Sequence, residues 1–138
     1  MFNLSTRILV VDDMKSMRKM IINMIRDIGF TDISEATDGQ LAWEVISKAS
    51  PPIELIISDW NMPNCTGLEL LKMVRGDAKT AKTSFLMITA EAEVRQVASA
   101  IKSGVDEYIV KPFAANSLID KLEKIHKKSL AVKTVPVK

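Results

Sequence analysis

The stretch LIISD, residues 55–59, joins three aliphatic residues to a serine and an acidic side chain. Apolar side chains on both faces of a strand are typical of a parallel sheet that helices cover on each side. Residues 8–11, ILVV, have the same character, and they also run into acidic residues, Asp12 and Asp13. We therefore predict that both stretches are central strands of one parallel sheet.

Short apolar runs alternate with amphipathic stretches along the chain, which is typical of repeated strand–helix units. Strands are predicted at residues 8–11, 32–36, 55–58, 85–88 and 108–110. Apolar residues that recur every three or four positions predict helices near residues 17–28, 41–49, 68–74, 94–101 and 118–125. The sequence thus predicts a doubly wound, flavodoxin-like α/β domain with a five-stranded parallel sheet and five helices.

Length and composition limit the class of protein. A chain of 138 residues with 47% hydrophobic and 26% charged residues is long enough for one core and is not typical of disorder. It lacks a secretory signal at its start, and Cys65 is a lone cysteine, so we expect a cytoplasmic protein. The net charge of +2 forms no basic stripe and no apolar run is long enough to span a bilayer, so neither nucleic acid nor membrane insertion is expected. We expect one domain over residues 1–128 and a flexible tail over residues 129–138.

Five polar side chains are predicted to meet where four strands end, the edge at which open parallel sheets bind ligands. Asp12 and Asp13 follow the first strand, and Asp59, Thr89 and Lys111 end three others. Two carboxylates about 4 Å apart repel by roughly 4 kcal/mol at an effective dielectric constant near 20, so a bound cation is expected to offset them. Oxygen ligands of this kind suit Mg²⁺, while a lysine and a hydroxyl suit phosphoryl oxygens. Each residue taken alone is most often an ordinary strand-end residue, but the five together indicate a site.

Four motifs in this order carry a family resemblance: Val10-Val11-Asp12-Asp13, Ser58-Asp59-Trp60-Asn61-Met62-Pro63, Thr89-Ala90-Glu91 and Tyr108-Ile109-Val110-Lys111-Pro112-Phe113. They resemble the receiver domain of two-component response regulators, and most closely its CheY-type chemotaxis members. The resemblance extends from about residue 7 to residue 128. It implies a CheY-like sheet with strand order 2-1-3-4-5 and a protein that acts as a monomer.

The resemblance implies a phosphoacceptor and a metal site. Asp59 would be the phosphoacceptor. Asp13, Asp59 and the backbone carbonyl of Asn61 would bind Mg²⁺ directly, and Asp12 would contribute through water.

The resemblance also implies a switch. Thr89 and Lys111 would contact the phosphoryl group, and the Tyr108 ring would turn inward as Thr89 moves. Asn61 and Glu91 match positions that influence dephosphorylation. The bond between Lys111 and Pro112 matches a peptide bond that the family keeps cis.

By the same resemblance, a sensor histidine kinase of the CheA type donates the phosphoryl group. The face formed by the fourth helix, fifth strand and fifth helix then binds a target, expected to be the flagellar motor switch in chemotaxis, and a separate phosphatase could reverse the signal. The chain would be a signalling switch rather than an enzyme, limited to self-catalysed phosphoryl transfer and autodephosphorylation. A phosphorelay intermediate is the alternative. An aspartyl-phosphate phosphatase is a different class, but it needs an Asp two residues after the nucleophile, where this chain has Asn61.

Other reactive or aromatic residues are not assigned to this site. His126 lies among lysines and is expected on the solvated surface, and Cys65 has no partner motif and is expected to be an inert thiol. Three methionines at core spacing are expected to pack inside: Met17, Met20 and Met24. Trp60 could either cover the loop after Asp59 or contact a partner.

Overall fold

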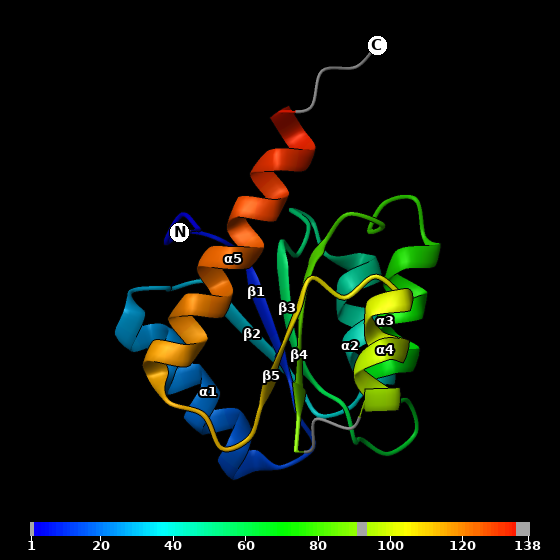
Figure 1. The fold of residues 1–138 in the computed structure, drawn as a ribbon, viewed down its shortest axis with the longest axis horizontal. Coiled ribbons are helices and arrows are strands. Elements are labelled where there is room, and N and C mark those ends of the chain that lie inside the picture. The colour runs from blue at the N-terminus through cyan, green and yellow to red at the C-terminus, as the bar shows by residue number, and fades with distance from the viewer. Residues whose placement is uncertain (1, 91–93, 135–138) are drawn as a thin grey trace.

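The structure, a computed structural model, describes residues 2–90 and 94–134. Five strands and five helices alternate along these residues (Figure 1). The strands are β1 (Ile8–Val11), β2 (Ile33–Ala36), β3 (Leu55–Asp59), β4 (Ser84–Thr89) and β5 (Glu107–Val110). The helices are α1 (Lys15–Ile28), α2 (Gly39–Lys48), α3 (Gly67–Gly76), α4 (Val94–Lys102) and α5 (Ala115–Thr134). Each of the predicted elements is present, and all their ends except the carboxyl end of α5 lie within a few residues of the expected positions.

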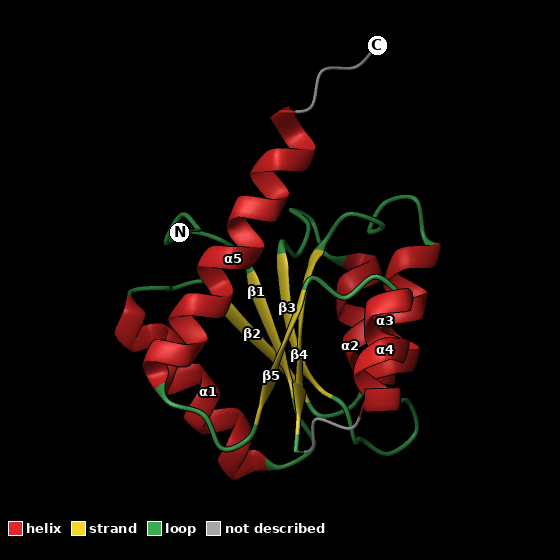
Figure 2. Ribbon diagram, in the orientation of Figure 1, coloured by secondary structure: helices red, strands yellow, loops and turns green. Residues whose placement is uncertain are grey.

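The sheet is parallel throughout, and its strand order is β2-β1-β3-β4-β5. Helices α1 and α5 cover one face of the sheet, and α2, α3 and α4 cover the other (Figure 2). The fold class and strand order expected from the sequence are therefore confirmed. The order reverses at β1, so the carboxyl ends of β1 and β3 lie next to each other at the switch point where such sheets bind ligands.

Two hydrophobic cores form because successive side chains of a strand point to opposite faces of the sheet. Leu9, Ile56 and Met87 face α2, α3 and α4, whereas Val10, Ile57 and Leu86 face α1 and α5. All residues of β1, β3 and β4 are buried, as predicted for the central strands. Edge strand β5 is only partly buried.

Helix ends follow local chemistry. Gly29 closes α1 with a φ of 124°, a conformation that favours glycine, and donates its backbone N–H to the Arg26 carbonyl. Thr66 and Glu69 form a capping box at the start of α3, each side chain accepting from the other's backbone N–H. This cap fixes α3 directly after the loop that follows β3.

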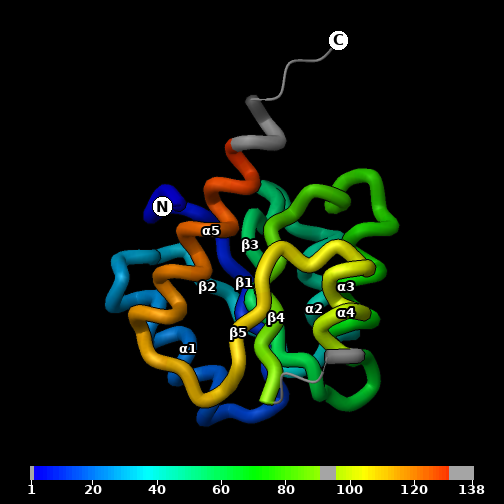
Figure 3. The backbone as a smooth tube through the Cα atoms, viewed as in Figure 1, coloured from blue at the N-terminus to red at the C-terminus, as the bar shows by residue number. Residues whose placement is uncertain are grey.

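Two expectations differ from the structure. Helix α5 continues to Thr134, past the 118–125 stretch predicted for it. Figure 3 shows its backbone running beside the amino-terminal segment. The sequence has no helix breaker between Ala115 and Pro136. Met20 is 37% exposed, whereas Met17 and Met24 are half-buried against the core. Only one face of α1 can pack on the sheet, and Met20 lies beside the face that Ile21, Ile22 and Ile25 bury. No helix among the described residues is long and apolar enough to cross a bilayer.

Gly67 allows α3 to approach β3 closely. Its backbone N–H donates to the Trp60 carbonyl at 2.9 Å. A Cβ atom at this position would clash with the Asp59 carbonyl oxygen and lie 2.8 Å from the Met87 sulfur. A side chain at residue 67 would therefore push directly on the backbone of the third strand's acidic end.

We expect Gly67→Ala to lower the free energy of unfolding by about 1–3 kcal/mol, because the added methyl group meets backbone that cannot move aside cheaply. Gly76, the last residue of α3, is a matched control, since a Cβ atom there meets nothing within 4 Å. Gly76→Ala should be neutral or stabilising by up to about 1 kcal/mol. Urea unfolding of the two variants measures the difference. Equal changes in the free energy of unfolding would contradict the close approach of α3 to β3 at Gly67.

Candidate functional site

Three carboxylates gather at the carboxyl edge of the sheet. Asp59 is the last residue of β3, and Asp12 and Asp13 directly follow β1. Val11 pairs with Ser58 in the parallel register, so the two strands end side by side. One carboxylate oxygen from each aspartate lies within 4.8 Å of the others. The structure thus brings together the three aspartates that the sequence predicted to meet.

Asp12 is the deepest of the three and is completely buried. Its Oδ1 accepts the backbone N–H of Met14 at 2.9 Å. Its Oδ2 is buried and has no hydrogen-bond partner among the residues that the structure describes. A buried carboxylate oxygen without a donor costs free energy, so this atom marks a place where a bound group would be stabilising. Asp13, in contrast, is exposed to solvent.

Lys111 brings the only positive charge that contacts these aspartates among the described ion pairs. Its Nζ lies 3.0 Å from Asp59 Oδ1 and 3.8 Å from Asp12 Oδ2. The backbone N–H of Lys111 donates to the Thr89 carbonyl at 2.8 Å, which ties the end of β5 to the end of β4. The Lys111–Pro112 peptide bond is cis, as the family resemblance implied. One lysine does not balance three carboxylates, so the site retains a net negative charge.

Burial raises the pKa of both deep carboxyls. The pKa of Asp12 lies above its ordinary value chiefly because burial removes water from the ion, with a smaller opposite effect from the Met14 backbone N–H. The pKa of Asp59 is raised for the same first reason, and Lys111 opposes that rise. Keeping both carboxylates ionised therefore costs the folded protein free energy, and a bound cation would lower that cost.

The donor set fits Mg²⁺. Mg²⁺ prefers oxygen ligands and commonly uses one or two carboxylates while keeping several waters. Here the exposed carboxylate of Asp13, the buried carboxylate of Asp59 and the buried Asp12 Oδ2, which has no donor among the described residues, lie within 4.8 Å of one another. No sulfur or imidazole ligand accompanies the three aspartates in that cluster. The chemistry of the cluster therefore favours a hard divalent cation over zinc or copper.

The other predicted site residues surround this cluster to different degrees. Thr89 ends β4 and is 4% exposed, beside the end of β3 because Asp59 pairs with Ile88. Asn61 is exposed in the loop after β3. Tyr108 lies on β5, farther from the carboxyl edge, half-buried against the core beneath α4, with Lys121 Nζ 5.2 Å from its ring centroid. Glu91 lies outside the described residues.

The sequence prediction missed Arg18. This α1 residue is buried, and its guanidinium donates to the Asp12 backbone carbonyl and to Glu35. The signal was present, because Arg18 lies three, four and seven residues before Ile21, Ile22 and Ile25 and therefore on the apolar face of the helix. A charged residue on a buried helical face requires a polar partner in the interior.

Trp60 and Cys65 both pack into the core beneath α2 and α3. Trp60 is only 9% exposed, so its side chain covers the loop after Asp59 rather than offering a free surface to a partner. Burial raises the pKa of the Cys65 thiol, which agrees with the expectation of an inert thiol.

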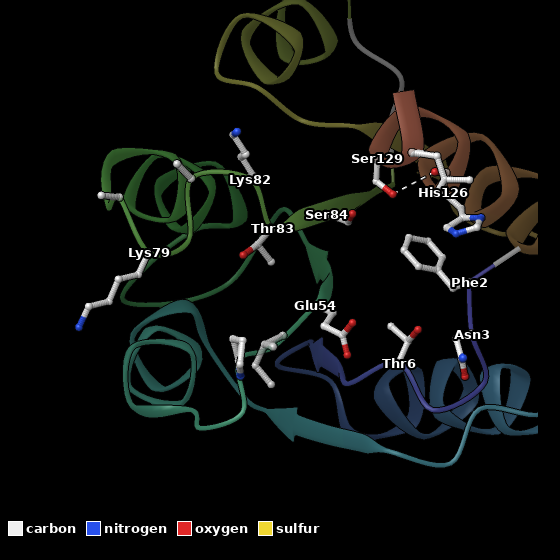
Figure 4. A pocket seen from close by; sticks show the side chains of 15 residues that line it. Phe2, Asn3, Thr6, Glu54, Lys79, Lys82, Thr83, Ser84, His126 and Ser129 are labelled. Carbon is white, nitrogen blue, oxygen red and sulfur yellow. Dashed lines mark hydrogen bonds between the residues drawn. The ribbon is translucent and has the colours of Figure 1, made fainter. Parts of the chain in front are cut away.

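A cavity of about 610 Å³ lies at the opposite, amino-terminal edge of the sheet (Figure 4). Its lining includes Thr6 before β1, Glu54 before β3 and the start of β4 at Ser84. His126 also lines it, half-buried with its ring centroid 4.9 Å from that of Phe2, so this residue, expected on the solvated surface, is only partly solvated. The side chain packs on Phe2 because α5 passes over the amino-terminal segment. The cavity is separate from the aspartate cluster.

Comparisons with known proteins point to one family. The model for the response regulator receiver domain matches residues 8–123. The chain is 44% identical to the chemotaxis protein CheY of Pseudomonas aeruginosa over 86% of this chain and 94% of that protein. It is 43% identical to CheY-3 of Vibrio cholerae, over 89% of this chain and 93% of that protein. The solved structure of the chemotaxis response regulator CheY4 of Vibrio cholerae is similar with a TM-score of 0.80 and 33% identity, covering 88% of this chain and 98% of that one.

Asp12→Asn is expected to raise the free energy of unfolding without metal at pH 7 by on the order of 1 kcal/mol, because it removes the cost of burying a carboxylate and the repulsion from the other aspartates, which together outweigh the lost attraction to Lys111. The pKa of Asp12 is raised above 3.8, so the native state binds more protons than the unfolded state as pH falls through that raised value. Once Asp12 of the wild type is protonated, it no longer carries the cost of a buried charge. The difference in free energy of unfolding between Asp12→Asn and wild type should therefore shrink near pH 4.

Urea unfolding in chelator at pH 7 and near pH 4 measures this difference. Asp120→Asn is the control, because Asp120 is exposed on α5 and pairs only with Lys124 among the described ion pairs; that pair is worth about 0.3–0.5 kcal/mol. An Asp12→Asn advantage that stayed constant or grew on acidification would show that its carboxylate is not the strained group.

Proposed function

This chain belongs to the response regulator receiver domain family, and on that basis we propose that Asp59 accepts a phosphoryl group from a sensor histidine kinase. The observation that carries the proposal is the placement of Asp59 between a lysine ammonium at 3.0 Å and the carboxylates of Asp12 and Asp13. This arrangement leaves the Asp59 carboxylate partly neutralised at the carboxyl edge of the sheet. The receiver is of the CheY type, a signalling switch.

In the proposed transfer, an Asp59 carboxylate oxygen attacks the phosphorus of a phosphohistidine. The new bond is an acyl phosphate, the phosphorus–nitrogen bond breaks, and the histidine nitrogen leaves with the bonding electron pair. Mg²⁺ would supply charge neutralisation between the phosphoryl oxygens and the carboxylates, held by Asp13, Asp59 and the Asn61 carbonyl, with Asp12 acting through water. Lys111 already contacts Asp59, so its ammonium can follow a phosphoryl oxygen with little rearrangement.

The switch is proposed to run from the acceptor through Thr89 to Tyr108. Thr89 is buried beside the end of β3, where its hydroxyl can donate to a phosphoryl oxygen on Asp59. Tyr108 is only half-buried and therefore has room for an outward and an inward position. Phosphorylation can shift these positions only by interacting differently with each, and couplings of about 1–3 kcal/mol are typical.

The target is proposed to be the flagellar motor switch, bound by the face of α4, β5 and α5. This proposal is supported by the names of the relatives, which are chemotaxis proteins matched over nearly their whole length. We also propose a CheA-type kinase as donor, a separate phosphatase as a partner and a cytoplasmic location. Asn61 and Glu91 are proposed to influence dephosphorylation.

Purified protein incubated with a small phosphodonor and Mg²⁺ should incorporate one base-labile phosphoryl group at Asp59, because its carboxylate lies nearer to the Lys111 ammonium, at 3.0 Å, than that of Asp12, at 3.8 Å, and faces the other two aspartates. Asp59→Asn should abolish the label, and chelator should reduce it severely. Asp120→Asn on the exposed face of α5 should label normally. Equal labelling of the Asp59 variant would move the acceptor elsewhere.

Thr89→Ala should still accept a phosphoryl group but lose most of the phosphorylation-dependent gain in target affinity, because it lacks the hydroxyl that senses the phosphoryl group. In wild type, beryllofluoride should tighten binding to the flagellar motor switch protein of the source organism by about 5–150-fold. Thr83→Ala, before the start of β4, is the matched control and should keep the wild-type ratio. A full wild-type ratio in Thr89→Ala would exclude this hydroxyl from the switch.

A further inference from the structure

Arg18 links three elements next to the aspartate cluster. Its Nη1 donates to the backbone carbonyl of Asp12 at 2.9 Å, and its Nε donates to Glu35 Oε1 on β2 at 2.6 Å. The Arg18 side chain is 10% exposed, whereas that of Glu35 is 42% exposed. The planar guanidinium is thus fixed at two of its donors, one bonded to the residue that follows β1 and the other to β2.

The bond to Asp12 acts on the position of Asp13. The Asp12 carbonyl belongs to the peptide group that joins Asp12 to Asp13, so Arg18 fixes the plane before Asp13. The next peptide group is fixed by its N–H on Met14, which donates to Asp12 Oδ1 at 2.9 Å. Arg18 also donates its own backbone N–H to the Met14 carbonyl at 2.9 Å. The backbone of Asp13 therefore lies between two constrained peptide groups.

Asp13 depends on this support because its side chain is exposed, in contrast to the buried side chains of Asp12 and Asp59. A metal ligand that core packing does not hold must be oriented through its backbone. Groups that orient ligands in this way typically change metal affinity by 10–100-fold when they are removed.

We propose that Arg18, held by Glu35, is a positioning residue that orients Asp13 for divalent cation binding. The inference rests on the proposed function, in which Asp13 is a ligand of Mg²⁺. Glu35 contributes in two ways: it fixes the guanidinium of Arg18, and its negative charge offsets that of the guanidinium. The offset reduces the repulsion between Arg18 and a divalent cation bound nearby. Neither residue touches the acceptor carboxylate in any described contact, and their effect passes through the Asp12–Asp13 peptide group.

A positioning role and a purely electrostatic role predict opposite signs. Arg18 is a positive charge near a site for a dication, so electrostatics alone predicts that its removal tightens Mg²⁺ binding. Loss of positioning predicts weaker binding. A residue that merely stabilises the fold would lower thermal stability without changing the dissociation constant of the folded protein.

The experiment titrates full-length protein in a Trp43→Phe background with Mg²⁺, at a temperature where every variant is folded. The remaining tryptophan, Trp60, follows Asp59 in the sequence, and its fluorescence reports binding. Arg18→Met should weaken Mg²⁺ binding by about 10-fold. Arg18→Lys keeps the charge but cannot donate to both acceptors from one planar group, and it should weaken binding by less. Arg26→Met, which removes an exposed arginine from the last turn of the same helix, should bind Mg²⁺ as wild type does.

A mutant cycle tests the role of Glu35. Glu35→Ala should weaken Mg²⁺ binding less than Arg18→Met, and the double variant should be no weaker than Arg18→Met, because Glu35 acts through Arg18. Unchanged or tighter binding in Arg18→Met would overturn the proposal, as would additive losses in the double variant. If Arg18→Met does not fold, Arg18→Lys and Glu35→Ala decide by the same criterion. Wild type that fails to bind Mg²⁺, or Asp13→Asn that binds equally well, would instead refute the proposed function.

Discussion

The structure depends on one constraint: a parallel sheet places the carboxyl ends of β1 and β3 side by side, and both ends carry aspartates. Like charges at such a distance repel, and burial of Asp12 and Asp59 adds to the cost of ionisation. Lys111 offsets part of this charge through contacts with both buried aspartates. The negative charge that Lys111 does not neutralise favours a bound cation. The strand order of the sheet therefore determines the chemistry of the site, because it brings the aspartates together.

The two cores hold this arrangement in place. Side chains from alternate positions of β1 and β3 pack under α1 and α5 on one face and under α2, α3 and α4 on the other. Two helices also make specific contacts near the strand ends: α1 through Arg18 to the Asp12 carbonyl, and α3 through Gly67 to the backbone after Asp59. A charged site that would disrupt an isolated strand is thereby stabilised by packing on both sides.

Sequence patterns predicted the elements, the central strands and the meeting of the aspartates with Lys111, because burial on both faces and strand-end position follow from local periodicity. They did not predict the contacts of Arg18, since its partners come from β1 and β2 and become neighbours only after the sheet forms. The partial burial of His126 and the exposure of Met20 were missed for a related reason. Helical periodicity gives a face, but how far a neighbouring segment such as Phe2 covers that face is a tertiary property.

The strand order also separates stiff from compliant parts of the sheet. Asp59 lies on β3, which has hydrogen-bonded neighbours on both sides and is buried throughout. Tyr108 lies on β5, a rim strand with one neighbour and incomplete burial. A structural change that begins at Asp59 on β3 therefore first reaches a partly buried strand at β5, next to β4. We therefore expect β5 to change conformation more easily than β3, which holds Asp59 in place.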